Sequence, residues 1–193
     1  MKTSGKLAHM RSVPRHLGMR LGRAAFTLIE LIVVIVITAI LAGVAVPAMN
    51  SIANSRGSGA ARAIVQHLSF AREQALNSGN RVWVVFDPDA ESYALFAEPD
   101  GGSGYADALS LVDPTTGRQM GMRLDRGEFA GIGIASASFV GSTPNLTPVV
   151  GFDWLGSPLT QSGSALGSDG EVVLTTGTMI EVRVFTGDIR IAE

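Results

Sequence analysis

The longest apolar stretch of the chain runs from Phe26 to Val46. No side chain between Leu31 and Val46 is charged. A helix rises about 1.5 Å per residue, so this stretch predicts a helix about 30 Å long, close to the thickness of the hydrocarbon core of a bilayer. We therefore expect residues 26–49 to form a transmembrane helix.

A second helical pattern follows and occupies residues 50–80. Its beginning is polar and includes Gly57 and Gly59, which predict a looser turn because each glycine costs a helix about 1 kcal/mol relative to alanine. Apolar residues then recur every three or four positions and form one stripe. The stripe consists of Ala61, Ile64, Val65, Leu68, Ala71, Ala75 and Leu76. The helix is predicted to end at residues 77–80, with Gly79 as its C-terminal cap.

The remainder, residues 81–193, has the short apolar runs and the turn residues that are typical of β-strands. Strands are predicted at residues 81–86, 92–97, 118–124, 128–135, 149–153, 171–175, 179–185 and 189–192. Residues 136–148 and 155–168 are rich in Gly, Ser, Thr and Pro and predict loops. The expected fold class is therefore α+β, with a long N-terminal helix packed on one domain that contains an antiparallel β-sheet or sandwich.

Two of these predicted strands are joined by a hairpin turn. Residues 87–91 carry Pro88 at a position where turns favour proline. In the run at residues 179–185, aliphatic and charged side chains alternate, so we expect Glu181 and Arg183 to face away from the core.

Charge separates the first 25 residues from the rest of the chain. This segment contains six basic residues and no acidic one: Lys2, Lys6, Arg11, Arg15, Arg20 and Arg23. Such a flank predicts a cytoplasmic N-terminus and export of everything after Pro47. Without residues 1–25 the chain has 9 basic and 17 acidic side chains, a formal charge of −8, which disfavours a broad phosphate-binding surface. Cysteine is absent, so no disulfide can stabilise an exported domain.

Glu30 is the one charged residue inside the apolar stretch. A carboxylate at the centre of a bilayer costs about 2.5 to 3.5 kcal/mol, but Glu30 lies near one end of the stretch, where it can stay at the headgroup level. We expect this carboxylate to find a positively charged partner when two such helices pack together.

The segment Ala25-Phe26-Thr27-Leu28-Ile29-Glu30-Leu31 resembles the leader and N-terminal helix of type IV prepilins and type II secretion pseudopilins. This resemblance implies that prepilin peptidase cuts between Ala25 and Phe26 and methylates the new amine of Phe26. It implies that Glu30 neutralises the terminal amine of a neighbouring subunit in a filament, and that Pro47 kinks the helix. Ala25 departs from the family, in which most members have glycine at this position.

The same resemblance implies a cleaved leader at residues 1–25 and a pilin-like domain at residues 81–193. The protein would be a single-pass protein of the inner membrane with a periplasmic ectodomain, and would then enter a pilus or pseudopilus with other pilin-like subunits. The apolar stretch alone leaves an uncleaved signal anchor open, while a secretory signal peptide agrees less well because its apolar region has only about 7–15 residues.

The globular part resembles the branch of minor pilins and pseudopilins that includes secretion pseudopilin H and the pilus protein FimT. The likeness rests on residues 68–76, 81–86, 151–158 and 180–191, and another type of minor pilin is the alternative. Nothing in it distinguishes a secretion pseudopilus from a type IV pilus.

Some members of that branch end in a Gly-Arg-x-Arg turn that is linked to DNA binding. The corresponding residues here are Gly187-Asp188-Ile189-Arg190, in which Asp188 replaces the first arginine. Arg190 alone offers a single phosphate contact, so it is only a weak candidate and we expect no DNA binding.

The residue inventory disfavours an enzyme. His67 is the only histidine after residue 25, lysine and cysteine are absent there, and no catalytic residue or zinc site is predicted. We interpret His67 as a boundary residue of the helix. Gly131-Ile132-Gly133 lacks the third glycine of a dinucleotide-binding motif and predicts a strand instead. No cofactor is expected.

Five acidic residues raise the alternative of a calcium site: Asp87, Asp89, Glu91, Asp100 and Asp107. Their spacing lacks the EF-hand pattern, so we interpret them as solvated turn residues. The alternative function is a membrane-anchored module that binds DNA or an exported substrate through the loops at residues 101–104 and 157–168.

Overall fold

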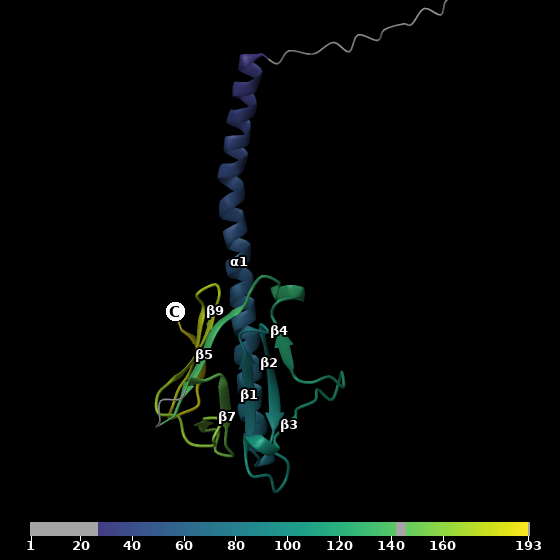
Figure 1. Cartoon of the computed structure of the whole chain (residues 1–193), viewed down its shortest axis with the longest axis vertical. Coiled ribbons are helices and arrows are strands. Elements are labelled where there is room, and N and C mark those ends of the chain that lie inside the picture. The colour runs from purple at the N-terminus through teal and green to yellow at the C-terminus, as the bar shows by residue number, and fades with distance from the viewer. Residues whose placement is uncertain (1–26, 142–145, 193) are drawn as a thin grey trace, which may run out of the picture. The chain divides into compact units, whose positions relative to one another are not determined.

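The computed structural model describes residues 27–141 and 146–192, except for the side chains of residues 44–50 and 146. The chain divides into two compact units, Met1–Gly43 and Val44–Glu193. The described part of the first unit consists of the beginning of helix α1, and the second unit holds the rest of that helix and all the described β-strands (Figure 1).

Helix α1 extends from Leu28 to Ser78. It ends where predicted, because Gly79 adopts a left-handed φ of 73° and its N–H donates to the carbonyl of Ala75 at 3.0 Å. Within the described residues, no helix combines enough length with enough apolar character to cross a membrane.

The predicted looser turn near Gly57 and Gly59 is wrong, because the backbone is helical through both residues. A Cβ atom on Gly57 would lie 2.6 Å from Oγ1 of Thr176, and one on Gly59 would lie 3.1 Å from the ring of Phe129. The glycines therefore permit two loops to approach the helix, and this packing outweighs their low helix propensity.

The first sheet contains six antiparallel strands in the order β3-β2-β1-β7-β8, with β4 also paired to β2. Its strands are β1 (Val82–Asp87), β2 (Ser92–Ala97), β3 (Leu109–Ser110), β4 (Gly121–Arg123), β7 (Val149–Phe152) and β8 (Pro158–Leu159). The 3-10 turn η1 (Tyr105–Asp107) connects β2 to β3, and a second one, η2 (Gly127–Phe129), follows β4 where the chain leaves this sheet. The predicted hairpin at residues 87–91 is confirmed, because Asp87 pairs with Ser92.

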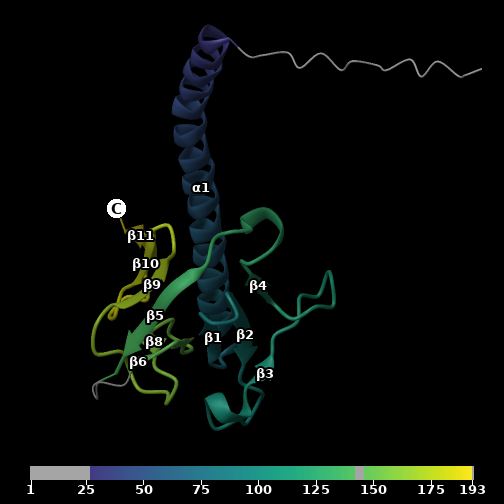
Figure 2. The same ribbon diagram turned by 45° about the horizontal axis from the view of Figure 1, so that its top comes forward.

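The second sheet contains five antiparallel strands in the order β11-β10-β9-β5-β6. They are β5 (Ile134–Val140), β6 (Leu146–Thr147), β9 (Gly170–Leu174), β10 (Met179–Val182) and β11 (Ile189–Ala192). Both sheets lie beside the C-terminal part of α1 in the two views (Figures 1 and 2).

One hydrophobic core joins the helix to both sheets. The predicted stripe supplies most of the helical side, and only Leu76 is misplaced, because 44% of its surface is exposed. The fully buried helical residues are Ala60, Ala61, Ile64, Leu68, Ala71 and Ala75. They share the core with side chains from the first sheet, such as Val84, and from the second, such as Val172. The α+β prediction, with a helix packed on antiparallel sheets, is confirmed.

Several predicted strands and loops need correction. The strand expected at residues 128–135 begins only at Ile134, and Gly131 lies in a turn with φ 90° instead of a strand. The loop expected at residues 136–148 contains most of β5 and all of β6. Strand β5 is rich in Ala and Ser, so its strand conformation follows from pairing with β9 and not from local propensity.

Three smaller differences concern the lengths and ends of strands. The loop expected at residues 155–168 contains the short strand β8, and the strand expected at residues 118–124 is reduced to β4. Strand β10 ends at Val182 because the N–H of Arg183 donates to the carbonyl of Asp188 at 2.8 Å, which closes a turn.

Candidate functional site

The N-terminal part of α1 presents an uncovered apolar surface. Every side chain described in residues 27–43 is exposed. The eleven large apolar side chains among them expose between 49% and 76% of their surface: Leu28, Ile29, Leu31, Ile32, Val33, Val34, Ile35, Val36, Ile37, Ile40 and Leu41. Burying them against another apolar surface would contribute on the order of 10 kcal/mol. This segment can therefore bind a partner or a lipid phase through hydrophobic burial.

The first turn of this helix contains a hydrogen-bonded cap. The side-chain oxygen of Thr27 accepts the N–H of Glu30 at 3.3 Å, and the carbonyl of Thr27 accepts the N–H of Leu31 at 3.2 Å. Thr27 and Glu30 have the Thr-x-x-Glu spacing of a capping box. The Glu30 side chain is exposed in the first turn, where the helix dipole favours a carboxylate. The site thus presents one carboxylate next to the apolar surface.

Further along the same surface, the hydroxyl of Thr38 is hydrogen-bonded within the helix. It donates to the carbonyls of Val34 and Ile35, each at 2.9 Å. The helix therefore hides this polar group within its own backbone, which lowers the cost of burying the surface.

The structure does not describe the side chains of three residues predicted for this site. Ala25 and Phe26 lie outside the described residues, so the cleavage and methylation sites stay predictions. Pro47 lies within α1, but its side chain is not described, and the kink predicted there stays a prediction as well.

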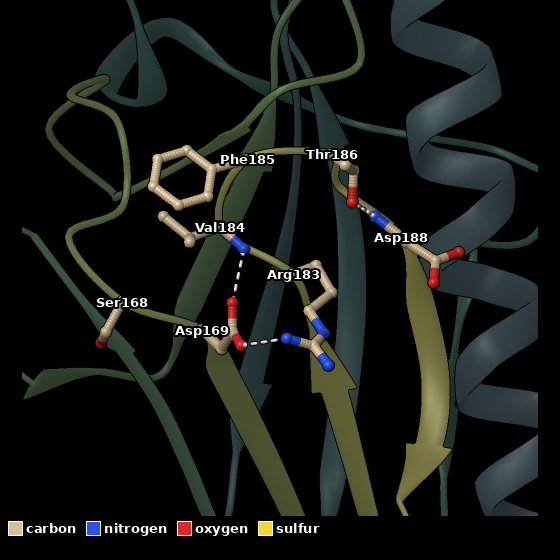
Figure 3. A pocket seen from close by; sticks show the side chains of 7 residues that line it. All are labelled: Ser168, Asp169, Arg183, Val184, Phe185, Thr186 and Asp188. Atoms are coloured by element: carbon tan, nitrogen blue, oxygen red, sulfur yellow. Dashed lines mark hydrogen bonds and ion pairs between the residues drawn. The ribbon is translucent and has the colours of Figure 1, made fainter.

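A second candidate surface lies at the turn between β10 and β11. Residues Ser168, Asp169, Arg183, Val184, Phe185, Thr186 and Asp188 line a pocket of about 600 Å³ (Figure 3). Asp169 supports the turn, because one carboxylate oxygen accepts the N–H of Val184 at 2.8 Å and the other binds Arg183 at 3.2 Å. The backbone hydrogen bond from Val184 lowers the pKa of Asp169 below its usual value.

Phe185 projects from this turn with 91% of its surface exposed. Sequence reasoning missed it, although the signal was present. In the alternating run at residues 179–185, Phe185 occupies the same face as Glu181 and Arg183, and that face was expected to point away from the core.

Arg72 joins the same turn to another loop. Its Nε–H donates to the carbonyl of Gly156 and its Nη2 donates to the carbonyl of Thr186, each at 3.0 Å. Gly187 is packed closely here, since a Cβ atom on it would contact the carbonyl oxygen of Gly156. Sequence reasoning missed this role of Arg72, because a bond to a distant main-chain carbonyl leaves no side-chain motif.

Arg190 lies on β11 and is engaged within the sheet. Its guanidinium binds Oε2 of Glu181 at 2.7 and 2.9 Å, and Glu181 also contacts Arg183 at 3.4 Å. A DNA phosphate would have to displace Glu181 from Arg190, the weak DNA-contact candidate.

His67 faces the first sheet. Its Nδ1 lies 2.6 Å from the hydroxyl of Tyr93, and the tyrosine is buried against Phe86 with ring centroids 5.6 Å apart. Burial lowers the pKa of His67 and raises the pKa of Tyr93. A neutral imidazole therefore accepts the phenol hydrogen most favourably in this arrangement.

Four of the five acidic residues considered for calcium have separate partners, and the first of them, Asp87, accepts the N–H of Ala90. Glu91 accepts the N–H of Ile134 at 2.6 Å, Asp100 accepts from Asn80, and Asp107 accepts from Ser103. Among residues 27–141 and 146–192, no three metal-ligating side chains come together.

Comparison with known proteins now adds to this geometry. Residues 20–46 match the model of the prokaryotic N-terminal methylation motif. Two structures of the minor pseudopilin EpsH from the type II secretion system of Vibrio cholerae resemble the chain. One has a TM-score of 0.50 and 12% identity and covers 71% of this chain and 93% of that one; the other has a TM-score of 0.48 and 13% identity and covers 71% and 96%.

No curated protein matches the sequence. At 12% identity the structural likeness concerns the fold alone. The chain thus carries a prepilin-type methylation motif at its N-terminus and a globular domain with a pseudopilin-like fold.

Proposed function

We propose that this chain is a minor pilin or pseudopilin, a structural subunit that enters a filament through its N-terminal helix. The observation that carries this proposal is the exposed apolar surface of residues 27–43, which begins at Thr27 and Glu30 inside the matched methylation motif. A surface of this size needs a lipid phase before assembly and neighbouring helices after it.

The proposed processing follows from the same motif. Prepilin peptidase cuts between Ala25 and Phe26 and methylates the amine of Phe26. Before assembly, the apolar stretch from Phe26 to Val46 holds the protein in the inner membrane, with the ectodomain in the periplasm. The structure describes the side chains of residues 27–43, whereas the apolar stretch in the sequence runs from Phe26 to Val46.

Glu30 is the proposed assembly residue. An unpaired carboxylate between packed apolar helices is costly, so it selects an arrangement in which a positive charge lies beside it. The methylated amine of a neighbouring subunit supplies that charge. Pro47, near the end of the apolar stretch, would bend the helix as it leaves the membrane or filament core.

A type II secretion pseudopilus is the first machine to test. The support is the fold shared with EpsH, which is a minor pseudopilin of such a system. Arg190 is already paired with Glu181, which gives DNA uptake no comparable support.

The first test is mass spectrometry of the membrane-extracted protein after cross-linking in cells. We expect an N-terminal peptide that starts at N-methylated Phe26, in chains cross-linked to other pilin-like subunits. A chain that still begins near Met1 and has no such neighbours would contradict the proposal.

Substitutions of Glu30 separate its charge from its place in the helix cap. Glu30→Gln keeps the spacing of a capping box but removes the charge. We expect Glu30→Gln and Glu30→Ala both to leave the protein in the membrane and to reduce its incorporation into filaments at least about tenfold, which corresponds to about 1.4 kcal/mol. Exposed Glu73, on the same helix but in the ectodomain, provides the control substitution Glu73→Gln. Normal incorporation of Glu30→Gln would exclude charge neutralisation.

A further inference from the structure

The turn between β7 and β8 presents two large apolar side chains. Trp154 exposes 52% of its surface, and the next residue, Leu155, exposes 69%. Both lie in a tight turn in which the N–H of Gly156 donates to the carbonyl of Asp153 at 2.9 Å. Together the two side chains expose on the order of 250 Å² of mostly apolar surface. The turn therefore carries a hydrophobic surface, which we call the Trp154–Leu155 tip.

Hydrogen bonds hold the backbone of this tip in place. Oδ1 of Asp153 accepts the N–H of Leu155 at 2.9 Å and the N–H of Ser157 at 2.8 Å. At the end of the turn, the carbonyl of Gly156 accepts the Nε–H of Arg72 at 3.0 Å. Side chains on a backbone that is fixed in this way lose less conformational freedom when they bind a partner.

Arg81 supports the indole of Trp154. Its Cζ atom lies over the ring at 5.9 Å from the ring centroid, which is within the range of a cation–π contact. The indole is therefore held by the chain itself, while about half of its surface stays free for a second contact. Tryptophan is among the residue types that are enriched where a few side chains dominate the energy of a protein interface.

The size of the tip limits the kind of partner that it can bind. A stable protein–protein interface buries about 800 Å² on each partner, roughly three times the surface of the tip. The tip alone is thus too small to hold a freely diffusing protein. It is large enough to bind a neighbour that other contacts already keep close, and the exposed apolar side chains of residues 27–43 offer such contacts.

We propose that the Trp154–Leu155 tip packs against an apolar patch on the globular domain of a different pilin-like subunit in the same filament. Subunits whose helices are packed together have a high effective concentration for each other, so a small surface is sufficient for a second contact. This inference rests on the proposed function and adds the surface and the chemistry of one subunit contact.

Two other occupants are less favourable. Without residues 1–25 the chain has 9 basic and 17 acidic side chains, so two copies of it repel each other at long range. A lipid surface is remote from the tip, because about 39 Å of helix separates Val46, the end of the apolar stretch, from Arg72, which binds Gly156.

The test places a photo-activated cross-linking amino acid at position 155 of the full chain, in cells that assemble the filament. We expect it to capture a peptide from the globular domain of another pilin-like subunit. The matched control places the same amino acid at Leu109, which is 64% exposed on β3 at the opposite edge of the same sheet, and should not capture this peptide.

Variants of the two tip residues test the apolar contact. Trp154→Ala should lower the cross-link yield from position 155 at least about fivefold, whereas Trp154→Phe should retain most of it because a ring is still present. The reciprocal pair has the cross-linking amino acid at position 154 and the substitution Leu155→Ser, which keeps the N–H that Asp153 binds. This pair should lower the yield about two- to fivefold, and it decides the outcome if Trp154→Ala destabilises the turn.

Other outcomes overturn the inference: capture of a second copy, of lipid or of an exported protein, no capture at all, equal capture from position 109, or a yield that responds to neither substitution. The N-terminal peptide is measured in the same sample. If Phe26 is methylated and the chain is in the filament, such an outcome rejects the contact surface alone. If Phe26 is not processed, the proposed function fails and the inference fails with it.

Discussion

At the scale of single residues, the globular unit contains one histidine, His67, whose protonation would destabilise the folded state. Burial lowers the pKa of His67, so the folded state prefers the neutral imidazole that accepts a hydrogen bond from Tyr93. A lowered histidine pKa means that the unfolded chain binds more protons than the folded one at mildly acidic pH. Its stabilising contribution is therefore complete above about pH 6.5 and is lost as the pH falls from there towards the folded pKa.

This linkage predicts how a His67 variant responds to pH. Between pH 7.5 and 5.5 the wild-type protein should lose more stability than His67→Gln, because the variant has no group to protonate at this position. Urea unfolding at both pH values measures the difference. An equal loss in the two proteins would contradict the assigned shift.

Arg72 is the second residue with a predictable effect. Its guanidinium binds the main-chain carbonyls of Gly156 and Thr186, which lie 84 and 114 positions further along the sequence. Arg72→Lys keeps the charge but cannot reach both carbonyls with a planar group. We expect a loss of about 1–3 kcal/mol in the free energy of unfolding, measured by chemical denaturation.

Arg62 on the same helix is the control for Arg72. It is exposed and makes no hydrogen bond among the described residues. Arg62→Lys should change stability by less than about 0.5 kcal/mol. Similar losses at both positions would show that the two carbonyl contacts have no special role.

At the scale of elements, the glycines of α1 show that a weak helix residue can be required by packing. An alanine at Gly57 would favour the helix by about 1 kcal/mol, but its Cβ atom would lie 2.6 Å from Oγ1 and 2.8 Å from Cγ2 of Thr176. We expect Gly57→Ala to lower the melting temperature in thermal unfolding, because the loop that carries Thr176 has to move.

Two further variants make this test specific. Ser58→Ala changes an exposed neighbour and should leave the melting temperature unchanged or raise it slightly. Thr176→Ala in the Gly57→Ala background should restore part of the loss, since it removes the clashing atoms. Without such rescue, the steric explanation would be wrong.

The elements also show where sequence reasoning is reliable. Strands β1 and β2 were predicted within one residue, because their apolar alternation and the Asp-Pro turn are local signals. Most of strand β5 was missed because residues 135–138 are Ala and Ser, which are neither β-branched nor aromatic, and its pairing partner β9 lies far along the chain. The role of Glu30 follows from a short motif and stays a prediction, whereas the partners of Arg72 are main-chain carbonyls that no sequence motif indicates.

At the scale of the whole molecule, the chain joins two surfaces of different chemistry. The N-terminal unit presents apolar side chains and one carboxylate, and the globular unit presents the exposed aromatic side chain of Phe185. Hydrophobic burial of the helix would supply a large free energy with little specificity, because eleven large apolar side chains are exposed there. We expect this burial to supply most of the free energy for the proposed entry into a filament.

The bonds of Arg72 have a consequence for how this protein can vary. Because the arginine binds the main chain of both loops, it places few demands on the identity of their side chains. We therefore expect the exposed side chains of Leu155 and Phe185 to tolerate exchange while the loops keep their positions. A lineage that retains Arg72, Gly156 and Gly187 can change the side chains at these loop tips by single substitutions and keep the bonds that hold the two loops.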